Sequence, residues 1–140
     1  MYTYQHQLVP GTVVRYKSAR YAYLVYHWGV IDHPTPYTGE LQVIHCDKGS
    51  VVRTTTMAEF FPEGGELETV HTPQDFLEAS RILSRMHSLD GRPYDLFVSN
   101  CEHVVTWAVT GTASSPQMRS AFLGLGLGVA AFALLKAARG

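Results

Sequence analysis

The stretch "YAYLVYHWGVID", residues 21–32, decides how the rest of this chain is interpreted. It is rich in β-branched and aromatic residues, which are favoured in strands. Stretches of similar character precede it at 8–16, "LVPGTVVRY", and follow it at 41–46, "LQVIHC", and 50–55, "SVVRTT". Two prolines and a glycine in "HPTPYTGE" at 33–40 and the glycine of "DKG" at 47–49 mark loops between the later stretches. We therefore predict a small antiparallel meander.

The hydrophobic period changes in residues 73–87, where apolar side chains recur at helical spacing. Thr72 suits the N-cap of this helix, and Pro73 suits its first helical position. Gly91 follows where a stop is expected. This segment predicts one amphipathic helix after the strands.

A second helix is predicted from Cys101 to about Val109, with Ser99 or Asn100 as its cap and Gly111 at its end. Strands followed by helices indicate an α+β fold. We expect a small antiparallel sheet packed against helices, one of which opens with Cys101.

Composition excludes several classes of protein. The chain has 140 residues, 46% hydrophobic and 16% charged, which predicts one folded domain. The net charge is −1 with scattered basic residues, so we expect no direct nucleic-acid partner. Two cysteines are too few for a disulfide scaffold, and the N-terminus has no basic region followed by an apolar run. We expect a cytoplasmic chain with reduced thiols.

Cys101 lies in "SNCEHVVTW", residues 99–107, at the predicted start of a helix. A helix N-terminus lowers the pKa of a thiol, and its unpaired N–H groups stabilise an oxyanion. This context suits a nucleophile. A small buried residue at a helix start is the competing interpretation.

A thiol nucleophile needs a base, and two of the seven histidines lie within predicted strands. His27 could accept the thiol proton, and His45 could fix the orientation and tautomer of His27. His6, His33, His71 and His87 are expected on the solvated surface.

A zinc site is the rival interpretation of the same residues. His45-Cys46 and Cys101-x-His103 offer four ligands, but neither pair has the spacing of structural zinc sites. We expect no metal and no cofactor.

"HWGV" at 27–30, "VIH" at 43–45 and "YDLFVSNCEHVV" at 94–105 together resemble the lecithin:retinol acyltransferase family. That family is a circularly permuted branch of the NlpC/P60 papain-like superfamily. The resemblance implies His27 as base, His45 as supporting residue and Cys101 as acyl-accepting nucleophile. The two motifs also contain four residues that the resemblance implies as supporting residues, namely Trp28, Asn100, Glu102 and His103.

Two branches of this family bear on function. The cellular phospholipase A and acyltransferase enzymes take an acyl chain from a phospholipid as a cysteine thioester. The picornaviral 2A proteins of the H-box/NC type are short chains with an apolar stretch near the C-terminus, and this chain is more similar to them. In the viral branch the motif does not guarantee activity, so the alternative is an inactive accessory factor that supports genome replication. A cysteine protease is a third, weaker hypothesis.

The end of the chain differs in kind, because "AFLGLGLGVAAFALL" at 121–135 contains no polar side chain. Fifteen residues are fewer than the roughly 20 of a membrane-spanning helix. Three interpretations of this segment are open: a membrane anchor or re-entrant segment, a core element of the fold, and an interface with another chain. We predict a domain at 1–111, a linker at 112–120 and an apolar segment at 121–140.

Together with the apolar segment, the resemblance to the viral branch implies a cytoplasmic protein associated with intracellular membranes of a host cell. Its expected partners are a phospholipid or membrane surface and host or viral replication proteins. Basic residues flank the apolar segment and suit phospholipid head groups, namely Arg119, Lys136 and Arg139.

Overall fold

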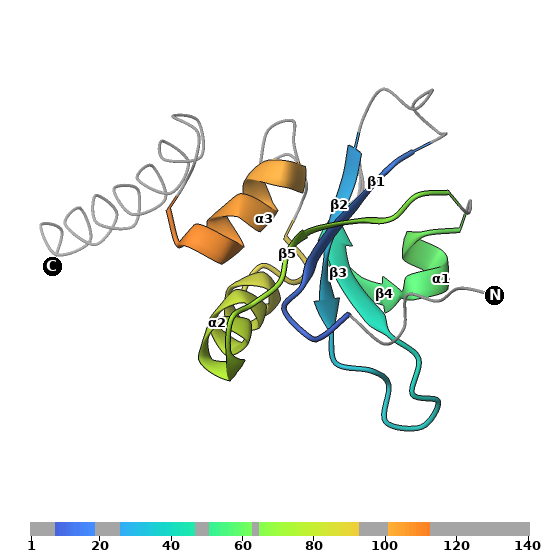
Figure 1. The fold of residues 1–140 in the computed structure, drawn as a ribbon, viewed down its shortest axis with the longest axis horizontal. Coiled ribbons are helices and arrows are strands. Elements are labelled where there is room, and N and C mark those ends of the chain that lie inside the picture. The colour runs from blue at the N-terminus through green and yellow to red at the C-terminus, as the bar shows by residue number, and fades with distance from the viewer. Residues whose placement is uncertain (1–7, 19–25, 47–50, 63–64, 93–100, 113–140) are drawn as a thin grey trace, which may run out of the picture.

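The computed structural model describes residues 8–18, 26–46, 51–62, 65–92 and 101–112, and of Cys101 it describes the backbone alone. These residues form a five-stranded antiparallel sheet and three helices (Figure 1). The elements are β1 (Val13–Lys17), β2 (Tyr26–Asp32), β3 (Gln42–Cys46), β4 (Val52–Thr56), α1 (Met57–Phe60), β5 (Glu68–His71), α2 (Phe76–His87) and α3 (Cys101–Thr110). The predicted α+β class is confirmed. The linker beyond Thr112 and the apolar segment 121–140 lie outside the described residues.

The strands lie in the order β4-β3-β2-β1-β5. The first four form the predicted meander, each antiparallel to the next. The sequence did not predict β5, which returns to pair with β1 at the far edge of the sheet. This strand has four residues, too few for a recognisable alternation of apolar and polar side chains.

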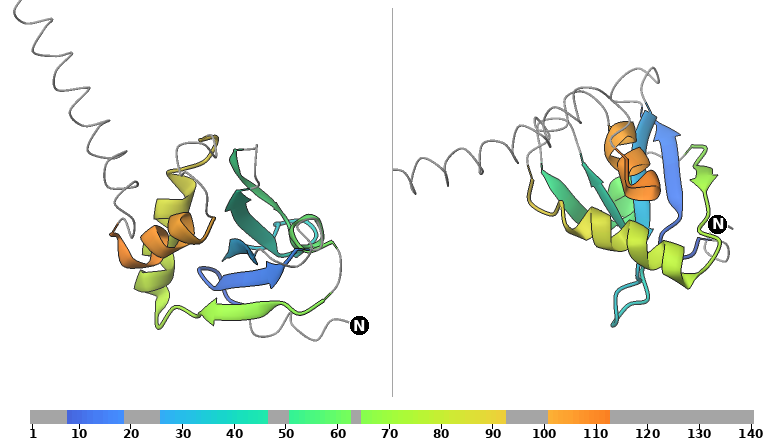
Figure 2. Two further views of the ribbon diagram at one scale, coloured as in Figure 1. Left: turned by 90° about the horizontal axis from the view of Figure 1, so that it is seen from above. Right: turned by 90° about the vertical axis from the view of Figure 1, so that its left-hand side faces the viewer.

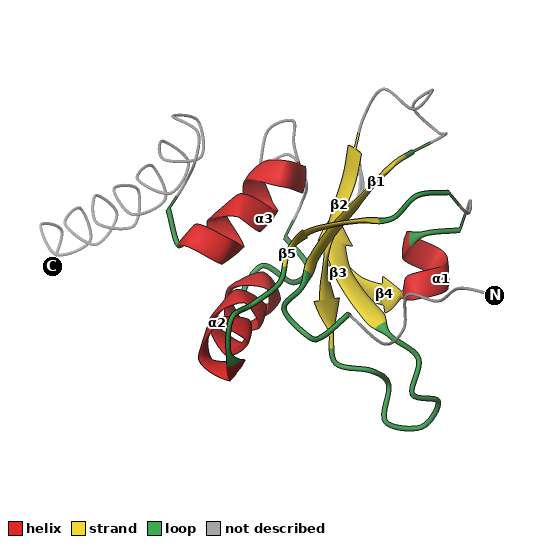
Figure 3. Cartoon of the chain, viewed as in Figure 1, coloured by secondary structure: helices red, strands yellow, loops and turns green. Residues whose placement is uncertain are grey.

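The sheet separates two apolar clusters. Because strand side chains alternate between faces, β1, β2 and β3 contribute residues to both. Figures 1 and 2 show α2 and α3 on one side of the sheet and α1 on the other, and Figure 3 marks the same three layers as helix, strand and helix. On the α2 and α3 side the buried residues include Val13, Trp28, Val30, Ile44, Ile82, Met86, Val104, Val105 and Ala108. On the α1 side they are Val14, Tyr16, Ile31, Val43 and Phe60.

The helix predicted over 73–87 begins three residues later than expected. Its N-cap is Asp75, whose side chain accepts a hydrogen bond from the backbone N–H of Glu78 at 2.8 Å. The predicted cap Thr72 and first helical residue Pro73 precede the helix. Aspartate is among the strongest N-cap residues, so its carboxylate sets the start of α2.

The second predicted helix is confirmed as α3, which runs to Thr110. Gly111 then adopts a positive φ of 72° and donates its N–H to the carbonyl of Trp107 at 2.7 Å. Arg85 of α2 donates to the carbonyl oxygen of Ala108 at 2.8 Å and so ties the end of α3 to α2. Among the described residues, no helix has the length and apolar character needed to cross a membrane.

Candidate functional site

Two predicted site histidines stand side by side on the face of the sheet that packs against α1. His27 lies in β2 and His45 in β3, and the register places Gly29 opposite His45. His27 is therefore the diagonal neighbour of His45, at a spacing that long side chains bridge. Nε2 of His27 lies 3.1 Å from Nδ1 of His45, within hydrogen-bond distance. Both imidazoles are buried, with 8% and 3% of their surface exposed.

The chain of hydrogen bonds continues into β4. Nε2 of His45 lies 2.8 Å from Oγ1 of Thr55, and this hydroxyl donates to the carbonyl of Thr56 at 3.3 Å. Thr55 faces Val43 in the register, so it too is a diagonal neighbour of His45. Sequence reasoning missed Thr55, because the alternation in β4 becomes informative only once the pairing with β3 is known.

Aromatic rings cover the histidine pair. The Phe60 ring centroid lies 5.1 Å from that of His27 and 5.2 Å from that of His45. Tyr16 approaches His27 edge-on at 5.6 Å. A Cβ atom at Gly29 would meet the Phe60 ring at 2.9 Å, so the absence of a side chain there makes room for this cover. Phe60 and Gly29 are thus structural parts of the site that the sequence did not identify.

Helix α1 delivers Phe60 to this position through a capping box. The Thr56 side chain accepts from the backbone N–H of Glu59, and the Glu59 carboxylate accepts from the backbone N–H of Thr56 at 2.9 Å. The backbone N–H and the hydroxyl of Thr56 both donate to the Glu59 carboxylate and hold the pKa of Glu59 below its usual value. A helix of four residues is marginal by itself, so we attribute its order to this cap and to the burial of Phe60.

Cys101 is the first residue of α3, as predicted. Figures 1 and 2 show that this N-terminal end of α3 is the end nearer the sheet. α3 packs against β2, the strand of His27, but it lies on the side of the sheet opposite to α1 and the histidine pair. The first turn of α3 carries N–H groups without partners inside the helix, which is the backbone arrangement that stabilises an oxyanion.

The structure does not bring all predicted supporting residues to the histidine pair. Trp28 points to the opposite face of the sheet, where the Arg15 guanidinium lies 5.1 Å from its ring. Glu102 is exposed and His103 is half-buried in the first turn of α3. Asn100 lies outside the described residues.

Cys46 follows His45 directly, yet the two side chains point to opposite faces of the sheet. His45 belongs to the α1 side, whereas Cys46 is a reduced thiol, 3% exposed, in the cluster beneath α2 and α3. One metal ion cannot bind both side chains in this geometry. A search of the residues that the structure describes finds no group of three or more potential ligands from His, Cys, Asp and Glu.

Among the remaining histidines, His33 and His87 are exposed as predicted, whereas His71 is half-buried. Nε2 of His71 lies 2.9 Å from the Glu78 carboxylate, and Nε2 of His87 lies 3.0 Å from the buried carboxylate of Asp32. These two contacts connect α2 to the sheet. His6 is not among the described residues.

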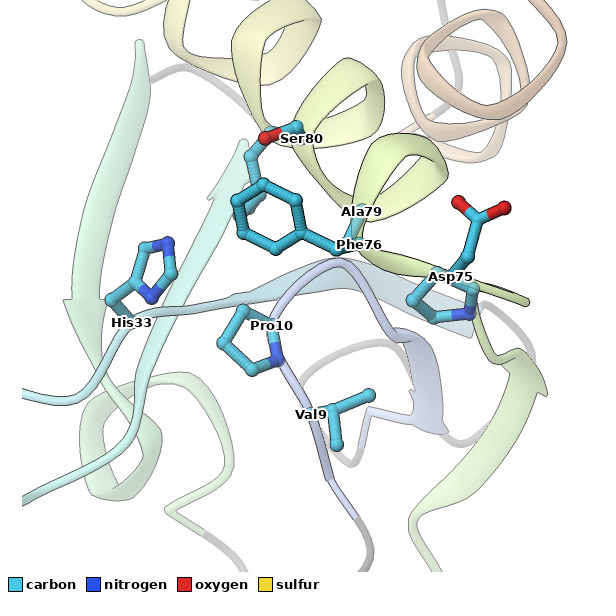
Figure 4. Close-up of a pocket in the computed structure, with 9 residues that line it drawn as sticks. Val9, Pro10, His33, Asp75, Phe76, Ala79 and Ser80 are labelled. Atoms are coloured by element: carbon cyan, nitrogen blue, oxygen red, sulfur yellow. The ribbon is translucent and has the colours of Figure 1, made fainter.

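A shallow apolar groove lies at the other end of the sheet (Figure 4). It has a volume of about 210 Å³ and is lined by residues that include Val9, Pro10, His33 and Phe76. His33 follows the end of β2, about 20 Å of extended strand away from His27. The groove is therefore separate from the histidine pair.

The fold and the site together define a class: an α+β domain with an imidazole pair on neighbouring strands and a cysteine opening the helix that follows. A family model described as lecithin retinol acyltransferase matches residues 6–114. The chain therefore belongs to this family, which indicates an acyltransferase- or phospholipase-like activity. Searches of curated proteins and of solved structures gave no match.

Proposed function

We propose that this protein is a thiol acyltransferase or phospholipase A that acts on the acyl esters of phospholipids. The observation that carries the proposal is the buried hydrogen bond of 3.1 Å between His27 Nε2 and His45 Nδ1. A histidine held in this way is oriented for proton transfer, and a helix that opens with Cys101 follows in the chain. Membership of the acyltransferase family supports this chemistry.

The proposed reaction has two halves. His27 takes the proton of the Cys101 thiol on Nδ1, the ring nitrogen that the hydrogen bond to His45 does not use. The thiolate attacks the ester carbonyl, the carbon–oxygen ester bond breaks, and the lysophospholipid leaves with the proton from His27. Water, an amine or an alcohol then attacks the thioester, gives its proton to His27 and takes the acyl group. Cys101 is released as thiolate and recovers that proton from His27.

The role proposed for His45 is to stabilise the imidazolium form of His27. Neutral His45 with its proton on Nε2 presents a lone pair on Nδ1 to the N–H of His27. This interaction persists when His27 carries two protons. It supports the ion pair of thiolate and imidazolium that makes a cysteine nucleophilic at neutral pH.

We also propose where the reaction takes place. The apolar segment 121–135 with its flanking Arg119, Lys136 and Arg139 would bring the domain to a phospholipid surface, on the cytoplasmic side of intracellular host membranes. Viral replication is the proposed setting, with host or viral replication proteins as further partners. Truncation after Gln117 should then abolish flotation with phosphatidylcholine vesicles and leave the thermal midpoint unchanged. A large fall in the midpoint would instead assign the segment to the folded core.

The test of activity is an acyl adduct. Wild-type protein incubated with labelled phosphatidylcholine should gain one acyl chain on Cys101, detected by mass spectrometry of its peptides. Cys101→Ser and His27→Ala should abolish the adduct, and His45→Ala should reduce it less, because orientation contributes less than proton transfer. Cys46→Ser is the matched control: its side chain is 3% exposed and points away from the histidine pair, so the adduct should persist.

The second candidate is an inactive accessory factor that keeps the fold and acts by binding membranes or replication proteins. The burial of both imidazoles beneath Phe60 favours it, since a substrate has to reach a covered pair. Folded wild-type protein that yields neither adduct nor free fatty acid would establish this candidate over the enzyme.

A further inference from the structure

The hydrogen-bond chain that starts at His27 does not end at His45. It crosses three neighbouring strands on one face of the sheet, from β2 through β3 to β4, and reaches the hydroxyl of Thr55 at 2.8 Å from Nε2 of His45. Thr55 is 8% exposed, so water competes little for this contact. Its hydroxyl is directed by the carbonyl of Thr56 at 3.3 Å.

The contact of the Thr55 hydroxyl with the Thr56 carbonyl at 3.3 Å is the basis from which we infer the direction of the hydrogen bonds, because a carbonyl oxygen only accepts. The Thr55 hydroxyl gives its hydrogen to Thr56, so its oxygen accepts from Nε2–H of His45. Nδ1 of His45 then has a lone pair, and His27 donates to it from Nε2. Nδ1 of His27 is left as the basic nitrogen. The tautomers of both histidines are thus assigned from the hydrogen-bond network.

The opposite assignment disables the base. If His45 carried its proton on Nδ1, it would donate to Nε2 of His27, and the proton of neutral His27 would lie on Nδ1. That nitrogen could not accept a proton from a thiol. On protonation of His27, two N–H groups would then face each other across 3.1 Å. The tautomer of His45 therefore decides whether His27 can work as a base.

We propose that Thr55 is a positioning residue, which sets the tautomer of His45 and, through it, keeps Nδ1 of His27 basic. This inference rests on the proposed function, in which His27 is the base for Cys101. Thr55 touches neither the thiol nor the substrate in this scheme. Its contribution is to favour the Nε2–H tautomer of His45, which in turn favours the Nε2–H tautomer of His27.

In the part of the chain that the structure describes, β4, α1 and β1 each place a charged or titratable group near the two histidines. Arg53 lies opposite His45 in the register, the Glu59 carboxylate of α1 interacts with His45 electrostatically, and Tyr16 of β1 contacts His27. A variant at Thr55 that removes only the hydroxyl leaves all three in place. A change in thiol titration in that variant therefore reports on the hydroxyl.

The experiment compares Thr55→Val, which has the same shape without the hydroxyl, with Thr55→Ser, which keeps the hydroxyl. Thr54→Val is the matched control, because Thr54 belongs to the same strand and points to the other face. The reaction of Cys101 with iodoacetamide is followed against pH by mass spectrometry of its peptide, beside thermal melts. We expect the midpoint for Thr55→Val to rise by about one pH unit, which lowers the thiolate fraction about tenfold at pH values below both midpoints. Thr55→Ser and Thr54→Val should titrate as wild type.

Where the wild-type Cys101 midpoint lies below that of an ordinary thiol, two results would overturn the proposal: a Thr55→Val profile equal to wild type, or a Thr55→Ser profile displaced as far as that of Thr55→Val. The second would assign the effect to packing of the methyl group. Imidazole nitrogen NMR supplies a readout that does not need an active thiol. Wild type should show His45 protonated on Nε2, and Thr55→Val should shift it toward Nδ1.

The thiol titration and the imidazole NMR together distinguish a failure of the proposed function from a failure of the proposed role of Thr55. If Cys101 titrates as an ordinary thiol in wild type while Thr55→Val still changes the tautomer of His45, the proposed function fails and the role of Thr55 stands. If wild-type His45 carries its proton on Nδ1, the role of Thr55 fails whatever the activity of Cys101.

Discussion

Replacement of Gly29 by alanine tests the packing that holds the histidine pair in place. A Cβ atom at this position would lie 2.5 Å from Cγ1 of Val43 and 2.9 Å from Cε2 of Phe60. Both distances are shorter than carbon atoms tolerate. Val43 and Phe60 are 0% and 1% exposed, so neither side chain has open space to move into. Overpacking of this kind costs about 2 kcal/mol, which lowers the thermal midpoint by about 10 °C in a domain of this size.

A double-mutant cycle tests the cause of that loss. Val43→Ala removes the methyl group at 2.5 Å and by itself costs about 2 kcal/mol, because two buried carbon atoms are lost. In the double variant the new methyl at position 29 occupies space that Val43 has left. We expect the double variant to be more stable than the sum of the single losses by about 1 kcal/mol, measured by urea unfolding.

The control for this cycle is Gly39→Ala. Gly39 has a φ of 66° and no atom within 4 Å of an added Cβ. Gly39→Ala should lower the free energy of unfolding by about 1 kcal/mol through backbone strain, and this loss should add to that of Val43→Ala without coupling. A Gly29→Ala variant as stable as wild type would refute the packing argument, as would additive losses at positions 29 and 43.

Two further predictions concern the helices. Arg85→Met removes the donor to the carbonyl of Ala108 and should lower the free energy of unfolding by about 1–3 kcal/mol, measured by thermal melts. The control is Arg81→Met, which should change it very little because Arg81 is exposed. Equal effects of the two variants would contradict the proposal that Arg85 links α2 to α3. The pKa of Glu59 is lowered in the folded state by hydrogen bonds from Thr56, so its stabilisation is complete above the unfolded value and is lost as the pH falls below 4.5 through the folded pKa. The stability difference between wild type and Glu59→Gln should therefore shrink between about pH 6 and pH 3, and a constant difference in melts across that range would contradict the capping role.

Most strands and the two longer helices are predictable from the sequence, because hydrophobic period is a local property. The β-branched and aromatic content of "HWGVID" at 27–32 and the β-branched content of "QVIH" at 42–45 do not depend on distant residues. The helix of Cys101 is predicted for the same reason. The short α1 and β5 are not, because four residues provide too little pattern and their order comes from tertiary packing. The predicted start of α2 at Thr72 is wrong because Thr72 with Pro73 also fits a helix start, whereas Asp75, a stronger N-cap residue, caps the helix in the structure.

The sequence by itself determined that two histidines lie in strands, that a cysteine opens a helix, and that the chain resembles an acyltransferase family. The tertiary structure alone decided that His27, His45 and Thr55 share one face and form a single hydrogen-bond chain. It also decided that Trp28 and Cys46, the neighbours of those histidines, face the other way. The physical reason is the strand register: it is set by pairing between segments far apart in the chain, and a slip of one residue would turn each side chain to the opposite face.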